Sequence, residues 1–412
     1  MGIRTGTRND ELSNTAQPSS GQCRVGRRDF LRTSALAGAG ALAGGTVLGR
    51  SATALAGRRK EYKTKHVILV AFAGGVRARD CIGSPENITK MSAIAAKGVV
   101  LPSVKAANLG HYGAALALMT GCPEARGIRE NGRGEVPTIF EYLRKDGGLS
   151  ASDVWLSTTA GAQTRNFAYS TNKNYGAEYG ANLISTDGLF NAEFRDLIGK
   201  FGNASLPGKK ETKQVKKLVG ALDNRLINGA VGGGIGNDAE TSLRIQRYIL
   251  EELRGDTARI TGPGSGDAKS IRVARNLLRL FRPKLITIVL QNADVAHGSY
   301  NSYVEVIRRN DQEIGMLWDS VQKDPELRDT TSIMILPEFG RNANLNERNG
   351  LDHGDGSEDL RKLFMIAAGP DFKQGATMTK AVNSYDVCPT IAELLGTKAE
   401  DARGKVLRSI LA

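Results

Sequence analysis

Histidine and cysteine are both scarce in this chain of 412 residues, with four of each. The cysteines show no Cys-x-x-Cys spacing, which argues against a zinc-thiolate site and against a disulfide framework. One disulfide bond is still compatible with the sequence. Beyond an N-terminal stretch the sequence also lacks any apolar run of about 18 residues, so we expect no transmembrane span. The positions of the four histidines are therefore informative about a possible site.

Acidic residues are outnumbered, with 43 Asp and Glu against 56 Lys and Arg, for a formal net charge of +13. Much of the excess lies in 209–217 and 272–282, each with an apolar stripe, and only Phe281 is aromatic among these residues. This pattern favours solvated helix faces over a nucleic-acid groove, so we expect no nucleic-acid partner. The positive charge favours a small anionic substrate or an anionic envelope surface.

The N-terminus has the pattern of a twin-arginine export signal, with paired arginines in 27–32, an Ala/Gly/Leu-rich stretch in 33–48, and Ala-Leu-Ala at 54–56. The alternative is a buried helix, but the stretch is interrupted by glycine and apolar all round. We interpret 1–56 as a cleaved signal and expect a periplasmic or secreted protein. Losing seven arginines and three acidic residues lowers the formal charge from +13 to +9.

Strand-like and helix-like patterns alternate along the mature chain, 57–412. Strands are expected near 66–72, 153–157, 285–290, 332–336 and 363–367, and helices near 88–96, 113–119, 138–145, 271–281, 303–321 and 387–394. This alternation predicts an α/β fold with a doubly wound, mostly parallel sheet flanked by helices. Between the two halves, 161–269 is rich in Asn, Gly, Tyr and Lys, with helices expected near 191–200, 210–227 and 239–254. We interpret it as an inserted cap region.

Three of the four histidines lie at strand exits or at a helix start. His111 precedes the helix near 113–119, His297 follows the strand 285–290 together with Asp294, and His353 ends the segment that begins with Pro337-Glu338. Open α/β sheets bind ligands beyond the carboxyl ends of their strands, so we expect these side chains to gather at one edge. One carboxylate and two imidazoles, from Asp294, His297 and His353, are a ligand set for zinc or a similar ion. In the alternative interpretation they only hydrogen-bond loops together.

Several segments carry a family resemblance. They are the strand-Gly-Gly-x-Arg of 67–77, Ala-Leu-Ala-Leu-Met-Thr-Gly at 115–121, Thr-Ile-Phe-Glu-Tyr-Leu at 138–143, and the segments 359–370 and 385–396. The chain resembles the alkaline phosphatase-like superfamily, which includes sulfatases and nucleotide pyrophosphatases. Its Glu-Phe-Gly-Arg at 338–341 and Asp-His-Gly at 352–354 are most similar to a poorly characterised, often twin-arginine-exported, sulfatase-related family.

The resemblance implies hydrolysis of phosphate or sulfate esters with the help of divalent metal, commonly two ions. This sequence departs from the pattern, because Ala73 stands where the first strand should end in a metal-binding Asp. Phe339 likewise falls in the usual Asp-His pair, and the position of the nucleophile falls on His111. By contrast, Asp294, His297 and His353 resemble the other metal site, with Asp294 and His297 one residue closer together than in the nucleotide pyrophosphatases.

We therefore expect one divalent ion, zinc by its ligand set, and a second that is absent or weakly held by Glu338 and His111. Arg341 or Arg77 is expected to neutralise the ester anion. Three roles stand open for His111: a polar residue at a helix start, a metal ligand, or a nucleophile. Two functions also stand open, an exported metal-dependent hydrolase of small anionic esters and a catalytically inactive envelope binding or scaffold protein.

Overall fold

The computed structural model describes residues 61–123, 132–159, 166–185 and 257–412, together with Arg244, Arg247, Tyr248 and Glu252. They belong to one compact unit, Arg59–Ala412. The expected export signal, 1–56, lies outside the described residues, as does most of the expected cap, 161–269, with its helices. None of the helices in the described ranges is both long enough and apolar enough to span a membrane.

The described residues form a nine-stranded mixed sheet with the order β4-β3-β5-β1-β6-β7-β2-β8, and β9 pairs with β2. The strands are β1 (His66–Phe72), β2 (Val99–Lys105), β3 (Val154–Thr158), β4 (Asn182–Ser185), β5 (Leu285–Leu290), β6 (Thr331–Pro337), β7 (Lys362–Ala368), β8 (Ala376–Thr377) and β9 (Val382–Asn383). Strands β4, β3, β5, β1 and β6 run parallel, whereas β7 is antiparallel to both β6 and β2. The expectation of a doubly wound, mostly parallel α/β sheet is confirmed.

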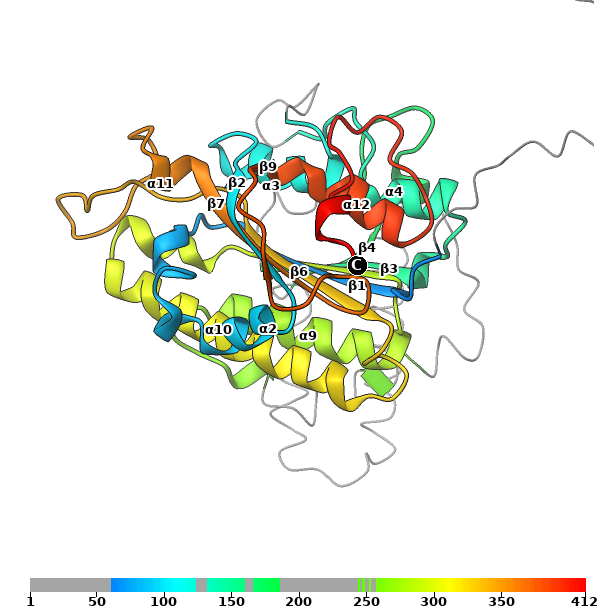
Figure 1. Cartoon of the computed structure of the whole chain (residues 1–412), viewed down its shortest axis with the longest axis horizontal. Helices are drawn as coiled ribbons and strands as arrows, with labels where there is room; N and C mark the ends of the chain where they lie inside the picture. The colour runs from blue at the N-terminus through cyan, green and yellow to red at the C-terminus, as the bar shows by residue number, and fades with distance from the viewer. Residues whose placement is uncertain are drawn as a thin grey trace, which may run out of the picture. The chain divides into compact units, whose positions relative to one another are not determined.

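Helices cover both faces of the sheet, as Figure 1 shows, with α2, α9 and α10 on one face and α3, α4 and α12 on the other. The α-helices are α2 (Thr89–Ala96), α3 (His111–Thr120), α4 (Ile139–Glu141, extended by a π turn over Tyr142–Asp146), α9 (Ser265–Phe281), α10 (Tyr300–Lys323), α11 (Glu358–Arg361) and α12 (Val387–Leu394). Short 3-10 turns are η1 (Ala78–Asp80), η2 (Pro85–Asn87), η4 (Ala151–Asp153), η6 (Ala177–Tyr179), η7 (Thr257–Arg259), η8 (Asn292–His297), η9 (Ser384–Asp386) and η10 (Arg408–Ile410).

Strand β1 lies at the centre of the sheet and supplies both hydrophobic cores. Ile68, Val70 and Phe72 pack into the core that includes residues of α2, α9 and α10. The alternate residues, including Val67 and Leu69, pack into the core that includes residues of α3, α4 and α12. A strand buried on both faces needs apolar residues at every position, which accounts for its unbroken apolar run.

Three features differ from the sequence expectations. Strand β2 was not expected, because Pro102 interrupts its apolar pattern, and its pairing with β7 shifts register between Leu101 and Val104. Strand β7 runs antiparallel, a direction that its composition does not encode. Helix α9 begins at Ser265, six residues before the expected start at Ile271, after Gly264 in a left-handed conformation.

Candidate metal centre

The three central strands end level with one another. Phe72 at the end of β1 lies opposite Leu290 of β5 and Pro337 of β6. The segments that follow these strands therefore leave the sheet at one edge. They carry Asp294 and His297 on η8 and Glu338 directly after β6, in keeping with ligand sites beyond the carboxyl ends of strands.

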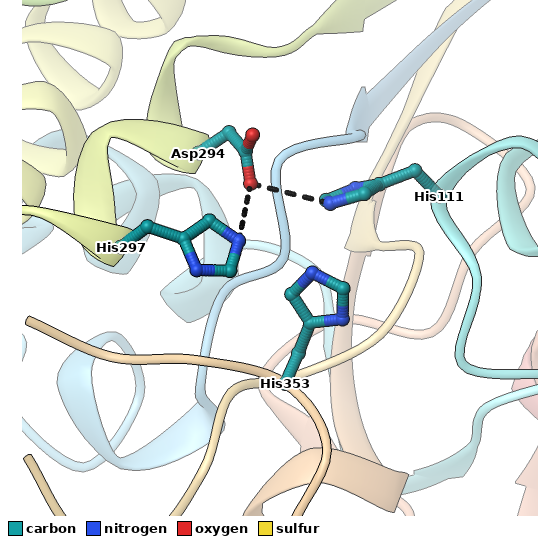
Figure 2. A group of neighbouring side chains, drawn as sticks. All are labelled: His111, Asp294, His297 and His353. Atoms are coloured by element: carbon teal, nitrogen blue, oxygen red, sulfur yellow. Dashed lines mark ion pairs between the residues drawn. The ribbon is translucent and has the colours of Figure 1, made fainter. Parts of the chain in front are cut away.

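Four side chains meet at this edge: His111 from the start of α3, Asp294 and His297 from η8, and His353 from the loop between β6 and α11. One ligand atom from each lies within 4.8 Å of the others. Figure 2 shows the Asp294 carboxylate between the rings of His111 and His297, with His353 entering from a separate loop. The expected gathering of these residues at one edge is what the structure has, and His111 joins the three expected ligands.

Asp294 Oδ1 is the common point of the group. It lies 3.2 Å from His111 Nε2 and 3.4 Å from His297 Nε2. Two ligand atoms held about 2.0–2.1 Å from one tetrahedral ion lie roughly 3.3–3.4 Å apart. The spacing of the side chains therefore fits a shared zinc-sized ion, and the donors, imidazole nitrogen and carboxylate oxygen, are those that zinc takes.

The outer nitrogens of two of the imidazoles are bound to carboxylates. His111 Nδ1 lies 2.7 Å from Glu338 Oε1, and His297 Nδ1 lies 2.7 Å from Asp352 Oδ1. Each carboxylate accepts a hydrogen bond from Nδ1–H, so that Nε2 is turned toward Asp294. A carboxylate behind the histidine is the usual support of a metal-binding imidazole, because it fixes the tautomer and the ring orientation.

Burial and close contacts shift the pKa values of the residues in and around this cluster. Burial opposes the charged form of His111, but hydrogen bonds with Asp294 and Glu338 outweigh it and raise the pKa of His111 to about 10. Burial raises the pKa of Glu338 to about 8. Although burial acts the other way, His111 and Arg341 hold the pKa of Asp294 well below its usual value. Burial and the neighbouring positive charges lower the pKa of His353 to about 4, so its ring is neutral near pH 7.

Glu338 lies behind His111 and is completely buried. It is not one of the four converging side chains. Its Oε1 holds the His111 ring, and its Oε2 has no hydrogen-bond partner. From the sequence, Glu338 was expected to help hold a weakly bound second ion. In the structure, the hydrogen-bond partner of its carboxylate is the His111 imidazole.

Arg341 contacts the cluster from inside the protein. Its side chain is fully buried, and Nη2 donates to Asp294 Oδ1 at 2.6 Å and to the carbonyl of Gly74. Nη1 donates to the carbonyl of Leu351, and Nε to that of Gly75. A guanidinium with these partners and no exposed surface acts on the site through Asp294, whereas direct contact with an ester anion would require the loops around it to move.

Arg77 is also buried, and the structure does not bring it into the cluster. Its guanidinium forms a paired hydrogen bond with Asp80, and Nη1 donates to the carbonyls of Asn342 and Ala343. The sequence expectation assigned Arg77 or Arg341 to the ester anion because exposure and partners cannot be read from a motif. In the structure both guanidiniums bind groups of the protein.

The two positions at which the sequence departs from the family pattern also lie at the cluster. The Ala73 carbonyl is 3.1 Å from His111 Nδ1. The Phe339 ring packs against the rings of His111 and His353, with centroids 4.8 Å and 5.0 Å apart. An alanine and a phenylalanine supply no side-chain ligand, so this side of the cluster is built from hydrophobic packing and backbone.

Sequence reasoning missed the residues that hold the ligands in place. The contact between Arg341 and Asp294 joins positions 47 residues apart, and Asn342, which binds the turn around His353, attracted no notice. A signal was present in the density of Asn, Asp and Gly between 342 and 356, because these residues form side-chain-to-backbone turns.

No family model matches the chain, and no curated protein matches it in sequence. Among solved structures it is similar to wild-type alkaline phosphatase PafA, with 9% identity, 86% of this chain and 99% of that chain covered, and a TM-score of 0.53. A quadruple mutant of PafA gives 10% identity with the same coverage and TM-score. The likeness extends over nearly the whole of the PafA chain, and the protein therefore has the alkaline phosphatase-like fold.

Proposed function

We propose that this protein is an exported, metal-dependent hydrolase of phosphate or sulfate esters that works with one tightly bound divalent ion. The observation that carries the proposal is the convergence of His111 Nε2, His297 Nε2 and Asp294 Oδ1, with His353 beside them. Two carboxylates support the outer nitrogens of the first two rings. A cluster that served only to join loops would not require this support.

In this proposal His111, Asp294, His297 and His353 hold the ion. A divalent ion that expanded from these four ligands to a fifth position would supply Lewis acidity there, polarising an ester oxygen or favouring the ionisation of a water molecule. Glu338 and Asp352 accept hydrogen bonds from the outer N–H groups of His111 and His297, so that the inner nitrogens face the ion. His111 loses its inner proton when the ion binds. Arg341 fixes Asp294. Zinc is the ion that we propose, because imidazole and carboxylate are among its preferred donors.

We propose a single tight ion because the second of the two expected sites lacks side-chain ligands at two positions, 73 and 339. Ala73 and Phe339 offer no donor, and the Arg341 guanidinium already contributes a positive charge 2.6 Å from Asp294 Oδ1. A second cation beside Asp294 would meet that charge at close range. Hydrolysis is then expected to be slow, since one ion cannot stabilise both the attacking and the leaving oxygen.

The proposed substrate class and location rest on the sequence. The basic composition favours a small anionic substrate, and the segments quoted above support a place in the alkaline phosphatase-like superfamily, near its twin-arginine-exported sulfatase-related members. The pattern in 1–56 supports export by the twin-arginine route to the periplasm or beyond. The fold alone does not decide the activity.

The second candidate is a non-catalytic binding or scaffold protein that keeps the fold. The observation in its favour is the packing of Phe339 on His111 and His353, where a catalytic pair of sites would need a ligand. In that case the four side chains still bind metal, or only one another, without turnover.

Ester hydrolysis by the zinc-loaded chain separates the two candidates. Aryl phosphate and aryl sulfate should be hydrolysed slowly by the loaded protein, and the rate should vanish after treatment with a chelator and in Asp294→Asn. Asn344→Ala is a matched control, because Asn344 is an exposed residue of the same loop as His353. A protein that binds zinc but hydrolyses neither ester at any measurable rate would favour the binding protein.

A further inference from the structure

His353 is held differently from the other two inner imidazoles. Carboxylates fix the rings of His111 and His297. Within the described ranges the His353 ring makes no hydrogen bond or ion pair, and it packs against the rings of His111, His297 and Phe339 at centroid distances of 4.7 Å, 5.0 Å and 5.0 Å. The direction of this ring therefore depends on the backbone turn that carries it.

Asn342 binds that turn on both sides of His353. Its backbone N–H donates to the carbonyl of Asp352 at 2.8 Å. Its side-chain Oδ1 accepts the N–H groups of Gly354 at 2.7 Å and Asp355 at 3.0 Å. Asn342 thus binds three residues that flank His353, namely Asp352, Gly354 and Asp355. The oxygen of an Asn side chain is suited to accept hydrogen bonds from successive backbone N–H groups in a turn.

The neighbouring residue reinforces the same contact. The Ala343 N–H donates to Asp355 Oδ2 at 2.8 Å. The loop residues 342–343 and the turn 352–355 are thereby joined by four hydrogen bonds. We call this group of bonds the Asn342 clip.

The Asn342 clip is anchored to the interior by Arg77. Arg77 Nη1 donates to the carbonyls of Asn342 at 3.1 Å and Ala343 at 3.0 Å. The guanidinium is held by Asp80 at 2.6 Å and 3.0 Å, and Asp80 also accepts the hydroxyls of Tyr300 and Tyr303 on α10 at 3.1 Å each. The clip is therefore fixed, through Arg77 and Asp80, to two tyrosines at the start of the long helix α10.

We propose that Asn342, anchored by Arg77, is a positioning residue for His353, acting through the turn and not by touching metal or substrate. This inference rests on the proposed metal centre. It assigns Arg77 to the support of a ligand, where the sequence had suggested contact with the ester. Loss of the clip should leave the fold intact but allow the His353 ring to leave the common point.

The test compares Asn342→Ala, Asn342→Asp and Asn344→Ala in the full chain. Zinc affinity is measured by calorimetry, visible absorption of the Co²⁺-loaded protein reports the ligand geometry, and the melting temperature of the metal-free protein reports the fold. Asn342→Ala should lower zinc affinity by about 10- to 100-fold and alter the Co²⁺ spectrum, the range seen when outer partners of metal ligands are removed. Its metal-free melting temperature should stay close to that of the wild type.

Asn342→Asp keeps the accepting oxygen and should retain most of the affinity, while Asn344→Ala, which changes an exposed residue outside the clip, should bind zinc like the wild type. Equal zinc affinity in the wild type and Asn342→Ala would overturn this inference and leave the proposed function standing. Equally weak binding by the Ala and Asp variants would also overturn it, since the accepted hydrogen bonds would not be the cause. A wild-type chain that binds no zinc would refute the proposed metal centre itself.

Discussion

Asp294 is the residue that the imidazoles and the guanidinium of the site share as a neighbour. Its Oδ1 faces His111 and His297 and accepts a hydrogen bond from Arg341. The carboxylate is half-exposed, whereas the guanidinium behind it is completely buried. Asp294 is therefore held from the inside by a permanent cation and is open to a metal on its other side.

Removal of the buried guanidinium should be costly. Arg341→Met leaves the carbonyls of Gly74, Gly75 and Leu351 without their donor and Asp294 without its nearest cation. We expect a loss of about 3 kcal/mol in the free energy of unfolding of the metal-free protein, measured by urea denaturation. Arg341→Lys keeps the charge but reaches fewer carbonyls, so an intermediate loss is expected. A Met variant as stable as the wild type would show that these bonds contribute nothing.

Zinc affinity should rise with pH because of His111. The pKa of His111, raised to about 10, means that the metal-free ring is protonated at neutral pH. An ion must displace that proton, so affinity should increase by about tenfold per pH unit at pH values below the pKa. His353 adds little to this slope, because its pKa of about 4 leaves it already neutral.

Calorimetry between about pH 6.5 and pH 8.5 measures how zinc affinity changes with pH, because binding that releases one proton becomes tighter as the pH rises. His111→Gln should bind more weakly and with a flatter pH dependence. A zinc affinity that does not change with pH in the wild-type protein would mean that His111 loses no proton when zinc binds, and hence is not a ligand.

At the residue scale, the sequence predicted which side chains converge but not the residues that support them. His297, His353 and Asp294 were found because histidine is scarce and these residues follow strands. The roles expected for Arg77 and Arg341 came from the charge of arginine alone. Both side chains are buried by contacts between segments far apart in the chain, and such burial is set by tertiary packing that no local pattern records.

At the scale of elements, the loops after β1, β5 and β6 hold the site together through close backbone contacts. A Cβ atom at Gly74 would lie 2.6 Å from the backbone nitrogen of Asp294 and 2.7 Å from the carbonyl oxygen of Gln291. The loop after β1 therefore packs directly against the start of η8, and only glycine leaves room for this approach.

Gly74→Ala should accordingly push η8 away from β1. We expect a loss of about 3 kcal/mol in the free energy of unfolding, because the opposing atoms are backbone and cannot rotate aside. The shift of Asp294 should also weaken zinc binding. Gly354→Ala is the control, since nothing lies within 4 Å of the Cβ position and the backbone there is not left-handed. Similar stability of both variants would contradict this view of the β1 loop.

Most elements were predictable from their periodicity, and the exceptions have physical causes. Strands β1, β5 and β6 are buried on both faces and show as mostly apolar runs, and α10 shows a regular apolar stripe. Strand β2 is a partly exposed strand with a proline, and β4, β8 and β9 are short. Their formation depends on neighbours in the sheet and leaves little trace in the sequence.

At the scale of the whole molecule, the proposal joins a periplasmic or secreted location to a metal centre assembled by folding. The four proposed ligands come from three separate segments, so the complete ligand set exists only once the sheet has formed. The twin-arginine route carries folded proteins, which agrees with loading of the ion before export.

Replacement of Arg27 and Arg28 by Lys should retain the protein in the cytoplasm. The translocase is expected to read the paired guanidiniums and not their charge alone, since Arg and Lys differ in hydrogen-bonding geometry. Cell fractionation with an antibody against the mature chain measures the outcome, and the unchanged signal serves as the control. Normal export of the double variant would refute the twin-arginine assignment.

The most direct test of the central claim is elemental analysis of the purified mature chain after loading with zinc and removal of unbound ions. The account predicts one zinc per wild-type chain and no stoichiometric zinc in His353→Ala, whose melting temperature should no longer rise on addition of zinc, because a ligand bound only by the native state stabilises it by mass action. No bound zinc in the wild type, two tightly bound ions per chain, or full retention of zinc by His353→Ala would contradict a single ion held by His111, Asp294, His297 and His353.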